Sequence, residues 1–254
     1  MEIIDSHTHL QFRGREEIKS LVARGYTAAV ACAFYPIVPR GPDTVLDMFD
    51  LLLKRYSGDV EGLKLFVALG IHPRSIPQNG AEQVLRELPA YLKKENVVAL
   101  GEVGLETGAP EEVLILEQQL SIARDTGAKV ILHTPKKDKE PIFEKELQLL
   151  KKSGIDPSHV IIDHNNEDTL DKVLKGGFYA GLTVSKGKMD AATAAKAICY
   201  YEDYSDFFLL NTDLGYSSDY LFDLVDATKI MERDLGPFLL RKAVHDNAKR
   251  FFNI

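Results

Sequence analysis

Short apolar runs alternate with amphipathic stretches along the whole chain. The runs are rich in Val, Ile and Leu at consecutive positions, which is typical of parallel strands covered on both faces. The stretches between them have apolar residues at helical spacing and end in Gly, Asn or Asp. The eight predicted strands are Glu2–Ser6, Thr27–Ala33, Leu65–Ile71, Val97–Glu102, Lys129–His133, Val160–His164, Phe178–Thr183 and Phe207–Thr212.

A predicted helix follows each predicted strand. These helices are Glu16–Arg24, Thr44–Tyr56, Ala81–Lys94, Glu111–Thr126, Lys139–Ser153, Asp168–Lys175, Asp190–Tyr201 and Ser218–Leu235, with a last helical segment at Pro237–Phe252. Strands that alternate with helices indicate parallel βαβ units, and eight such units favour a closed barrel over an open doubly wound sheet. A length of 254 residues suits one such barrel. The pattern therefore predicts an α/β fold, a single-domain (β/α)8 TIM barrel over residues 1–254.

Ionisable residues follow the ends of the predicted strands. They are His7 and His9 after the first strand, then His72, Glu102, His133, Asp163-His164 and Asp213 after the third, fourth, fifth, sixth and eighth. In such a barrel the C-terminal strand ends meet at the mouth that holds the active site. Strand side chains alternate between faces, so His7 and His9 point the same way. Imidazole and carboxylate groups suit zinc, and carboxylate-rich sites also admit manganese or magnesium.

Each of these residues also has an ordinary structural interpretation. A lone strand-end His is commonly hydrogen-bonded or solvated, Glu102 alone could be an ion-pair partner, and Asp213 alone could cap a helix before Ser217-Ser218. Four of the seven histidines and two carboxylates, however, lie at five strand ends. That coincidence favours one shared metal site made of His7, His9, Glu102, His133, His164 and Asp213.

Charge and motif content exclude several other classes. The sequence has no GxGxxG after the first strand and no GxxxxGK[ST], so a nucleotide cofactor or P-loop has no support. The net charge of −7 argues against binding along a long phosphate track, so we expect nucleic-acid contact only at an end or in a pocket. The apolar runs are too short for a membrane span.

The two cysteines and the N-terminal residues suggest a compartment. Cys32 and Cys199 lie in apolar stretches outside any CxxC, which predicts two buried, reduced thiols. Reduced thiols suit the cytoplasm, and the first residues have no basic region or cleavage site of a secretory signal. We therefore expect a cytoplasmic protein that does not associate with membranes.

The strand-end motifs occur in a familiar order. They are HTH (His7–His9), GIHP (Gly70–Pro73), GEVGLE (Gly101–Glu106), ILHTP (Ile131–Pro135), IDH (Ile162–His164) and NTD (Asn211–Asp213), with NAKRFF (Asn247–Phe252) near the end. This order resembles the TatD-type metal-dependent hydrolases over nearly the whole chain. HTH alone is weak evidence, whereas GIHP and GEVGL at this spacing are strong evidence.

The resemblance implies two divalent ions and hydrolysis of phosphodiesters, with deoxyribonuclease activity in several members. Carried over by position, His7, His9 and Asp213 would bind one ion, and His133 and His164 the other. Glu102 would bridge the two ions. His72 would lie beside them, near the substrate phosphate.

The chain also departs from the pattern of that family. Glu106 stands where Asp is usual, and Asn165-Asn166-Glu167 replace the usual Cys-Phe-Ser after His164. Asn211 replaces a Glu, Gly215-Tyr216 replace a proline turn, and Lys136-Lys137 stand near a usual Arg. The expected ligands are retained while the substrate-facing loops differ, as in a divergent, archaeal-type branch.

The resemblance suggests a mechanism in which two ions activate a shared water and clamp a phosphoryl group. Glu102 would bridge the ions, and Asp213 would bind one ion and accept the proton of the attacking water. Lys136, Arg74 and Tyr216 are candidate substrate contacts, with Lys186 and Lys188 as a possible second wall. The alternative for Lys136-Lys137 is a solvated charge run at the start of a helix.

Two other functions remain open from the sequence. An amidohydrolase or phosphotriesterase/lactonase-like enzyme uses the same barrel, often with a carboxylated Lys at the end of the fourth strand. Residues 97–105 contain no Lys, which disfavours that version, although Asp163-His164 is compatible with it. A non-catalytic binding barrel is the third possibility, but degenerate members usually lose ligands and this chain has all six. The sequence does not determine the natural substrate, the metal or the oligomeric state.

Overall fold

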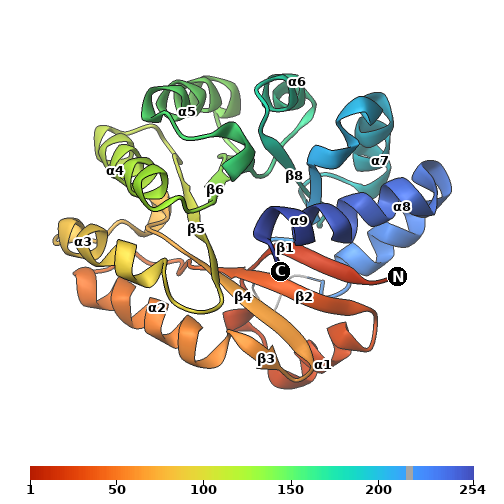
Figure 1. Ribbon diagram of the computed structural model, residues 1–254. Coiled ribbons are helices and arrows are strands. Elements are labelled where there is room, and N and C mark those ends of the chain that lie inside the picture. The colour runs from red at the N-terminus through yellow and green to blue at the C-terminus, as the bar shows by residue number, and fades with distance from the viewer. Residues whose placement is uncertain (216–219) are drawn as a thin grey trace.

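The computed structural model describes residues 1–215 and 220–254. Eight parallel strands form a barrel in the order β1-β2-β4-β5-β6-β7-β8-β9, and the helices surround it (Figure 1). The strands are β1 (Ile3–Thr8), β2 (Tyr26–Cys32), β4 (Leu63–Leu69), β5 (Val97–Gly104), β6 (Val130–His133), β7 (Val160–Ile162), β8 (Tyr179–Thr183) and β9 (Phe208–Asn211). The predicted (β/α)8 barrel is therefore confirmed.

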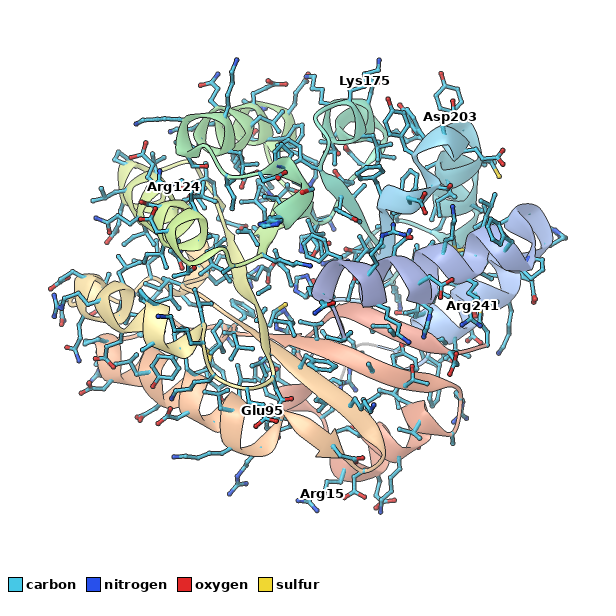
Figure 2. The ribbon with its side chains drawn as sticks, in the orientation of Figure 1. Arg15, Glu95, Arg124, Lys175, Asp203 and Arg241 are labelled. Carbon is cyan, nitrogen blue, oxygen red and sulfur yellow. The ribbon has the colours of Figure 1, made fainter. Side chains whose placement is uncertain are left out.

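The helices follow the strands as the pattern predicts. They are α1 (Arg15–Val22), α2 (Pro42–Arg55), α3 (Ala81–Tyr91), α4 (Pro110–Thr126), α5 (Lys139–Ser153), α6 (Glu167–Lys175), α7 (Ala191–Tyr200), α8 (Asp223–Arg241) and α9 (Asn247–Phe252). Their apolar faces pack on the strands, and charged residues such as Arg15, Glu95, Arg124, Lys175, Asp203 and Arg241 lie on the outside (Figure 2). In the part of the chain that is described, no helix is both long and apolar enough to cross a membrane.

Strand side chains alternate between two apolar layers. In β2, Ala29 and Ala31 belong to the large cluster between strands and helices, whereas Val30 and Cys32 belong to a smaller cluster inside the barrel. Phe251 of α9 joins this inner cluster, because α9 packs against β1 and β9. The barrel is a filled core, so its chemistry is confined to the loops at its ends.

The barrel closes between its first and last strands through backbone hydrogen bonds and through hydrogen bonds of one buried side chain. A single bridge joins Thr8 and Leu214, where the His9 backbone N–H donates to the Leu214 carbonyl at 2.7 Å. The Asp213 backbone N–H donates to the carbonyl of His7 at 2.9 Å. Below them, the buried carboxylate of Asp5 accepts the backbone N–H of Thr212 at 3.1 Å and its hydroxyl at 2.6 Å. This closure places the HTH motif beside Asp213.

The structure confirms the division between the last two predicted helices and corrects other expectations. The helical path breaks at Gly236 (φ 68°), and Pro237–Phe252 is helical throughout, with a π-helical turn at Lys242–Asp246 before α9. The left-handed φ of Gly236 suits glycine, and the residue before a proline avoids the helical region. The short strand β3 (Gly58–Val60), antiparallel to β4, was missed. Cys32 is buried as predicted, but Cys199 is exposed, because α7 buries Ala195 and Ile198 instead.

Candidate metal centre

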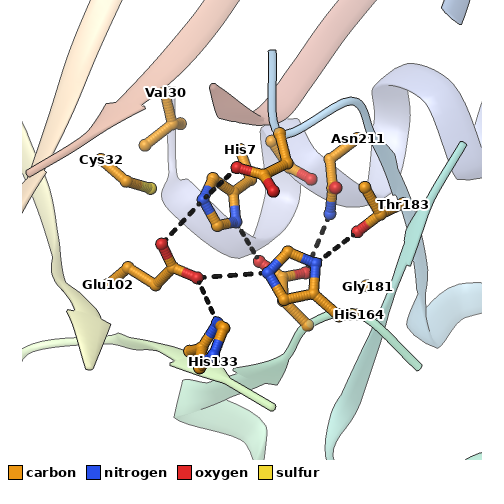
Figure 3. Close-up of polar contacts among 12 residues, drawn as sticks. His7, Val30, Cys32, Glu102, His133, His164, Gly181, Thr183 and Asn211 are labelled. Carbon is orange, nitrogen blue, oxygen red and sulfur yellow. Dashed lines mark hydrogen bonds and ion pairs between the residues drawn. The ribbon is translucent and has the colours of Figure 1, made fainter. Parts of the chain in front are cut away.

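The six predicted ligands meet at the C-terminal mouth of the barrel, beside a cavity of about 860 Å³. Figure 3 shows four of them, His7, Glu102, His133 and His164, directed towards one another. The Asp213 carboxylate lies 2.9 Å from Nε2 of His9. Glu102 lies between the other rings, with Oε1 2.8 Å from Nδ1 of His133 and 3.2 Å from Nε2 of His164. Its Oε2 atom lies 3.3 Å from Nε2 of His7. Side chains from five strand ends are therefore gathered around two carboxylates, Glu102 and Asp213.

Two of these residues have an uncommon backbone conformation. His164 and Asp213 each follow a strand end by two positions, and their φ angles are 60° and 53°. Non-glycine residues at positive φ cost free energy and are concentrated at functional sites. Here the left-handed turn aims each side chain at the mouth.

Each of the four histidines predicted to be ligands has a hydrogen-bond partner at one ring nitrogen, which holds its ring. Nδ1 of His7 pairs with the Asp163 carboxylate at 2.8 Å, and Nδ1 of His9 with the Cys32 carbonyl at 3.0 Å. Nδ1 of His164 lies 2.8 Å from the hydroxyl of Thr183, and Nε2 of His133 lies 3.0 Å from the carboxylate of Glu106. Such partners fix ring orientation and leave the other nitrogen free to bind a cation.

His72 shows the opposite arrangement. The backbone N–H of Arg74 donates to Nδ1 of His72 at 3.0 Å, so a neutral His72 ring carries its proton on Nε2. That Nε2 faces Glu102 at 3.5 Å. His72, Glu102 and His133 are close enough to hold an ion, but this tautomer makes His72 a hydrogen-bond donor rather than a ligand.

The donor set fits a divalent cation. Nε2 of His7 is fully buried and has no hydrogen-bond partner among the described residues, although it faces two carboxylates. Two groups, His7/His9/Asp213 and His7/Glu102/His164, each have ligand atoms within 4.8 Å of one another. Imidazole nitrogen with carboxylate oxygen is a zinc-type set that manganese can also occupy.

The pKa values show that negative charge dominates the centre. Burial alone would raise the pKa of Glu102, but the rings of His7, His72 and neighbouring histidines hold it well below its usual range. Burial likewise opposes ionisation of Asp213, yet the hydrogen bond with His9 and the nearby Lys188 ammonium keep its pKa low. Despite burial, the hydrogen bonds with Glu102 and Glu106 raise the pKa of His133 to about 9. Cations, including protons, are therefore attracted to this centre.

The pKa of His164 is shifted in the opposite direction to that of His133. Burial, followed by the charge of Lys188, lowers the pKa of His164 to about 4, and burial lowers the pKa of His72 well below its usual value. Both rings are therefore neutral near neutral pH. A neutral His164 offers its Nε2 lone pair towards the centre without first losing a proton.

Four of the basic residues predicted to contact substrate lie on the cavity wall. Arg74, Lys136, Lys186 and Lys188 line the cavity, whereas Tyr216 lies outside the described residues and Lys137 is not part of the wall. The guanidinium of Arg74 lies over the ring of Phe34, 4.8 Å from its centroid. The ammonium of Lys136 donates to the Gly187 carbonyl at 3.3 Å, which joins the loops after β6 and β8.

Sequence reasoning missed several residues of the site. Glu106 holds His133, and Lys139 donates to the His164 carbonyl at 2.9 Å. The adjacency of Asp163 to His164 and the spacing of Glu106 from Glu102 were available signals. Lys139 was hidden in a charge run, and no pattern along the chain marks its contact with the strand beside it.

Lys188 contacts the site more closely than the sequence indicated. Its ammonium forms an ion pair with the Asp213 carboxylate and lies 3.5 Å from Nδ1 of His164. The sequence placed it only on a possible second wall. The loop after β8 instead brings this charge directly onto a predicted metal ligand.

Comparisons with known proteins show which family the chain belongs to. The sequence pattern described as TatD related DNase matches residues 4–253. The chain is 34% identical to an uncharacterized metal-dependent hydrolase from Methanocaldococcus jannaschii, with 99% of this chain and 100% of that protein aligned. The structure is similar to that of a TatD-like protein from Archaeoglobus fulgidus, with a TM-score of 0.83, 32% identity, and coverage of 99% and 100% of the two chains.

A more distant structure shares the fold. The phosphotriesterase homology protein from Escherichia coli, whose structure has phosphate in its active site, is 15% identical with a TM-score of 0.76, over 99% of this chain and 98% of that one. At 15% identity this structure shows only that the fold is shared, whereas the relative at 34% identity, aligned over its whole length, also shows the family. The chain belongs to the TatD-related DNase family of metal-dependent hydrolases.

Proposed function

We propose that the protein is a two-metal phosphodiesterase of the deoxyribonuclease type, acting at a nucleic-acid end or on a small phosphodiester. The observation that carries this proposal is the position of Glu102. Its Oε1 atom faces His133 and His164, while its Oε2 atom faces His7 at 3.3 Å and His9 at 3.7 Å. A carboxylate that turns one oxygen to each half of a histidine cluster is suited to bridge two ions.

The residues around the cavity have complementary tasks in such a reaction. Two bound ions would lower the pKa of a shared water and offset charge on the attacked phosphoryl group. Asp213, with its low pKa, remains a carboxylate that can accept the proton of the attacking water. His72 directs its Nε2–H towards the site and can donate to a substrate oxygen. Asp213 and Glu102 are therefore the proposed catalytic carboxylates.

The charge around the cavity favours a short substrate. Its wall includes the basic residues Arg74, Lys136, Lys139, Lys186 and Lys188, but also Glu167, Asp168, Asp190 and Asp223. Because acidic residues lie beside the basic ones, the positive charge around the cavity is enough for only a short substrate with few phosphates. Binding should therefore weaken gently with salt, with a slope of about one or two phosphates.

The substrate class is tested with a panel of compounds. Cleavage of a 3′-ended single strand, a closed circular single strand, a bis-aryl phosphodiester, a lactone and an ester would be compared with Mg²⁺, Mn²⁺ or Zn²⁺. We expect cleavage of the ended strand or the small diester and little cutting of the circle. Rapid cutting of the circle with a steep salt slope would contradict end-directed action.

The same panel separates the proposal from its rival. Turnover of the lactone or ester without any phosphoester cleavage would favour an amidohydrolase or lactonase-type enzyme. His133→Ala removes a proposed ligand, and His159→Ala, which removes a histidine that does not line the cavity, is its control. Activity that survives His133→Ala as well as it survives His159→Ala would exclude this centre as its source.

A further inference from the structure

His7 has a support that differs from those of the other ligand histidines. Its ring is fully buried, and Nδ1 lies 2.8 Å from Oδ2 of Asp163, which is itself 1% exposed. Among the four histidines proposed as ligands, His9 has a backbone carbonyl as the partner of Nδ1, and His164 has a hydroxyl. Glu106, the partner of His133, is 31% exposed. His7 is thus paired with the most deeply buried carboxylate of the set.

The second oxygen of Asp163 is also held. The side-chain amide of Asn211 donates to Oδ1 of Asp163 at 2.9 Å, and Asn211 is fully buried (Figure 3). Within the described chain, Oδ1 of Asn211 has no hydrogen-bond partner, so this amide is held through its donor. A buried amide with an unused acceptor costs free energy, which indicates that the donor matters here.

The neighbouring strand leaves room for this carboxylate. Gly181 lies in β8 between the strands that carry Asp163 and Asn211, and a methyl group at Gly181 would overlap Oδ1 of Asp163. Asn211 also stands where the resembling sequences usually have Glu. An acidic residue at position 211 would set two buried carboxylates against each other, and one of them would have to be neutral. Asp163, Asn211 and Gly181 therefore form one compatible unit.

We propose that Asp163 is a positioning residue that keeps the His7 proton on Nδ1 and directs Nε2 into the metal centre, with Asn211 and Gly181 holding the carboxylate in place. This inference depends on the metal centre of the proposed function. It does not depend on which bond the protein hydrolyses. Partners of this kind typically change metal affinity by about 10- to 100-fold when removed.

The direct test measures metal affinity and the ring proton of His7. Zn²⁺ or Mn²⁺ titration by calorimetry of Asp163→Asn and Asp163→Leu should show affinity for one of the two ions reduced by about 10- to 100-fold. In the zinc-loaded wild type, NMR should find a low-field ring proton on Nδ1 of His7, and this signal should shift or vanish in both variants. Unchanged affinity, or a proton on Nε2 in the wild type, would overturn the proposal.

Two reference variants make the result specific. Thr183→Val removes the partner of His164 and should weaken the other ion instead, while leaving the His7 ring proton in place. In a His9→Ala background, Asp163→Asn should cost little further affinity, because that ion site is already damaged. Equal loss of both ions in every variant would indicate general destabilisation and contradict a specific role.

Variants at position 211 keep the test decisive if Asp163 variants fail to fold. Asn211→Leu leaves Asp163 in place but removes its donor, and should reduce the affinity by a smaller factor, about three- to tenfold. Asn211→Asp should reduce the affinity further, because two buried carboxylates would then face each other and one of them would have to be neutral. If the proton is on Nδ1 and these affinities shift while no phosphodiester is cleaved, the inference stands and the proposed function falls.

Discussion

The floor of the cavity and its rim differ in how their side chains are held. The floor consists of His7, His9, Glu102, His133, His164 and Asp213, and the rim of Arg74, Lys136, Lys186 and Lys188. Every floor histidine lies at or just after a strand end and has a second hydrogen-bond partner. The rim residues are exposed, and they lie on loops except for Arg74, which lies in the short 3-10 helix Pro73–Ser75. Catalytic power should therefore reside in the floor, and substrate preference in the rim.

The largest expected effect comes from the two floor histidines at the end of the first strand. His7→Ala combined with His9→Ala should lower hydrolysis on the order of 10³-fold or more, because ion contacts supply several kcal/mol of transition-state stabilisation. Stability should change little, since the barrel core lies below the mouth. Turnover and circular dichroism would be measured beside the His159→Ala control. Unchanged activity with an intact fold would remove the floor from the mechanism, and collapse of the fold would indicate a structural metal.

Glu102→Gln tests whether the two halves of the floor share a ligand. A neutral amide cannot give a charged oxygen to each ion, so bound metal should fall from more than one equivalent to one or fewer. Activity should fall on the order of 10²-fold. Elemental analysis after purification without chelator measures the first effect. Two full equivalents in this variant would show that Glu102 does not bridge, and no metal in the wild type would refute the site itself.

The floor should also bind metal in competition with protons. The pKa of His133 is raised to about 9 and that of His7 is also raised, so near neutral pH an ion must displace protons from these rings. Metal affinity should thus increase as pH rises through the pKa of His133 at about 9, by up to about tenfold per unit for each proton displaced. Calorimetric titrations at several pH values provide the measurement. An affinity that does not vary with pH would contradict the anionic character of the centre.

Rim substitutions should have the smallest effects. Lys188→Met removes the cation beside Asp213, and we expect about a tenfold loss of hydrolysis through lost charge on the substrate side. Lys136→Met should cost only a few-fold, mostly in KM, because exposed charges are screened. Lys186→Met, in the loop that also carries Lys188, is the control for Lys188→Met and should cost equally little. Steady-state kinetics at two salt concentrations would rank them. Losses at Lys136 as large as those at His7 and His9 would abolish the distinction between floor and rim.

Local patterns predicted most of the fold and the floor. Apolar runs such as Val160–Ile162 mark buried strands because only both-face burial permits consecutive branched residues. Once eight parallel strands close into a barrel, their C-terminal ends meet at one mouth. Proximity of His7, Glu102 and His133 then follows from their positions in the chain. The break at Gly236 falls between the two helices that the pattern predicts, whereas the π-helical turn at Lys242–Asp246 was not predicted.

Tertiary structure alone decided how the floor and rim operate. Which nitrogen of His133 faces Glu102, and that Asn211 supports Asp163, depend on rotamers set by contacts between distant strands. The exposure of Cys199 and the approach of Lys188 to Asp213 likewise depend on which face a helix buries and where a loop turns. Sequence periodicity determines the face on which a residue lies and the strand end it follows. Distances and hydrogen-bond partners arise only when side chains far apart in the chain compete for the same buried space.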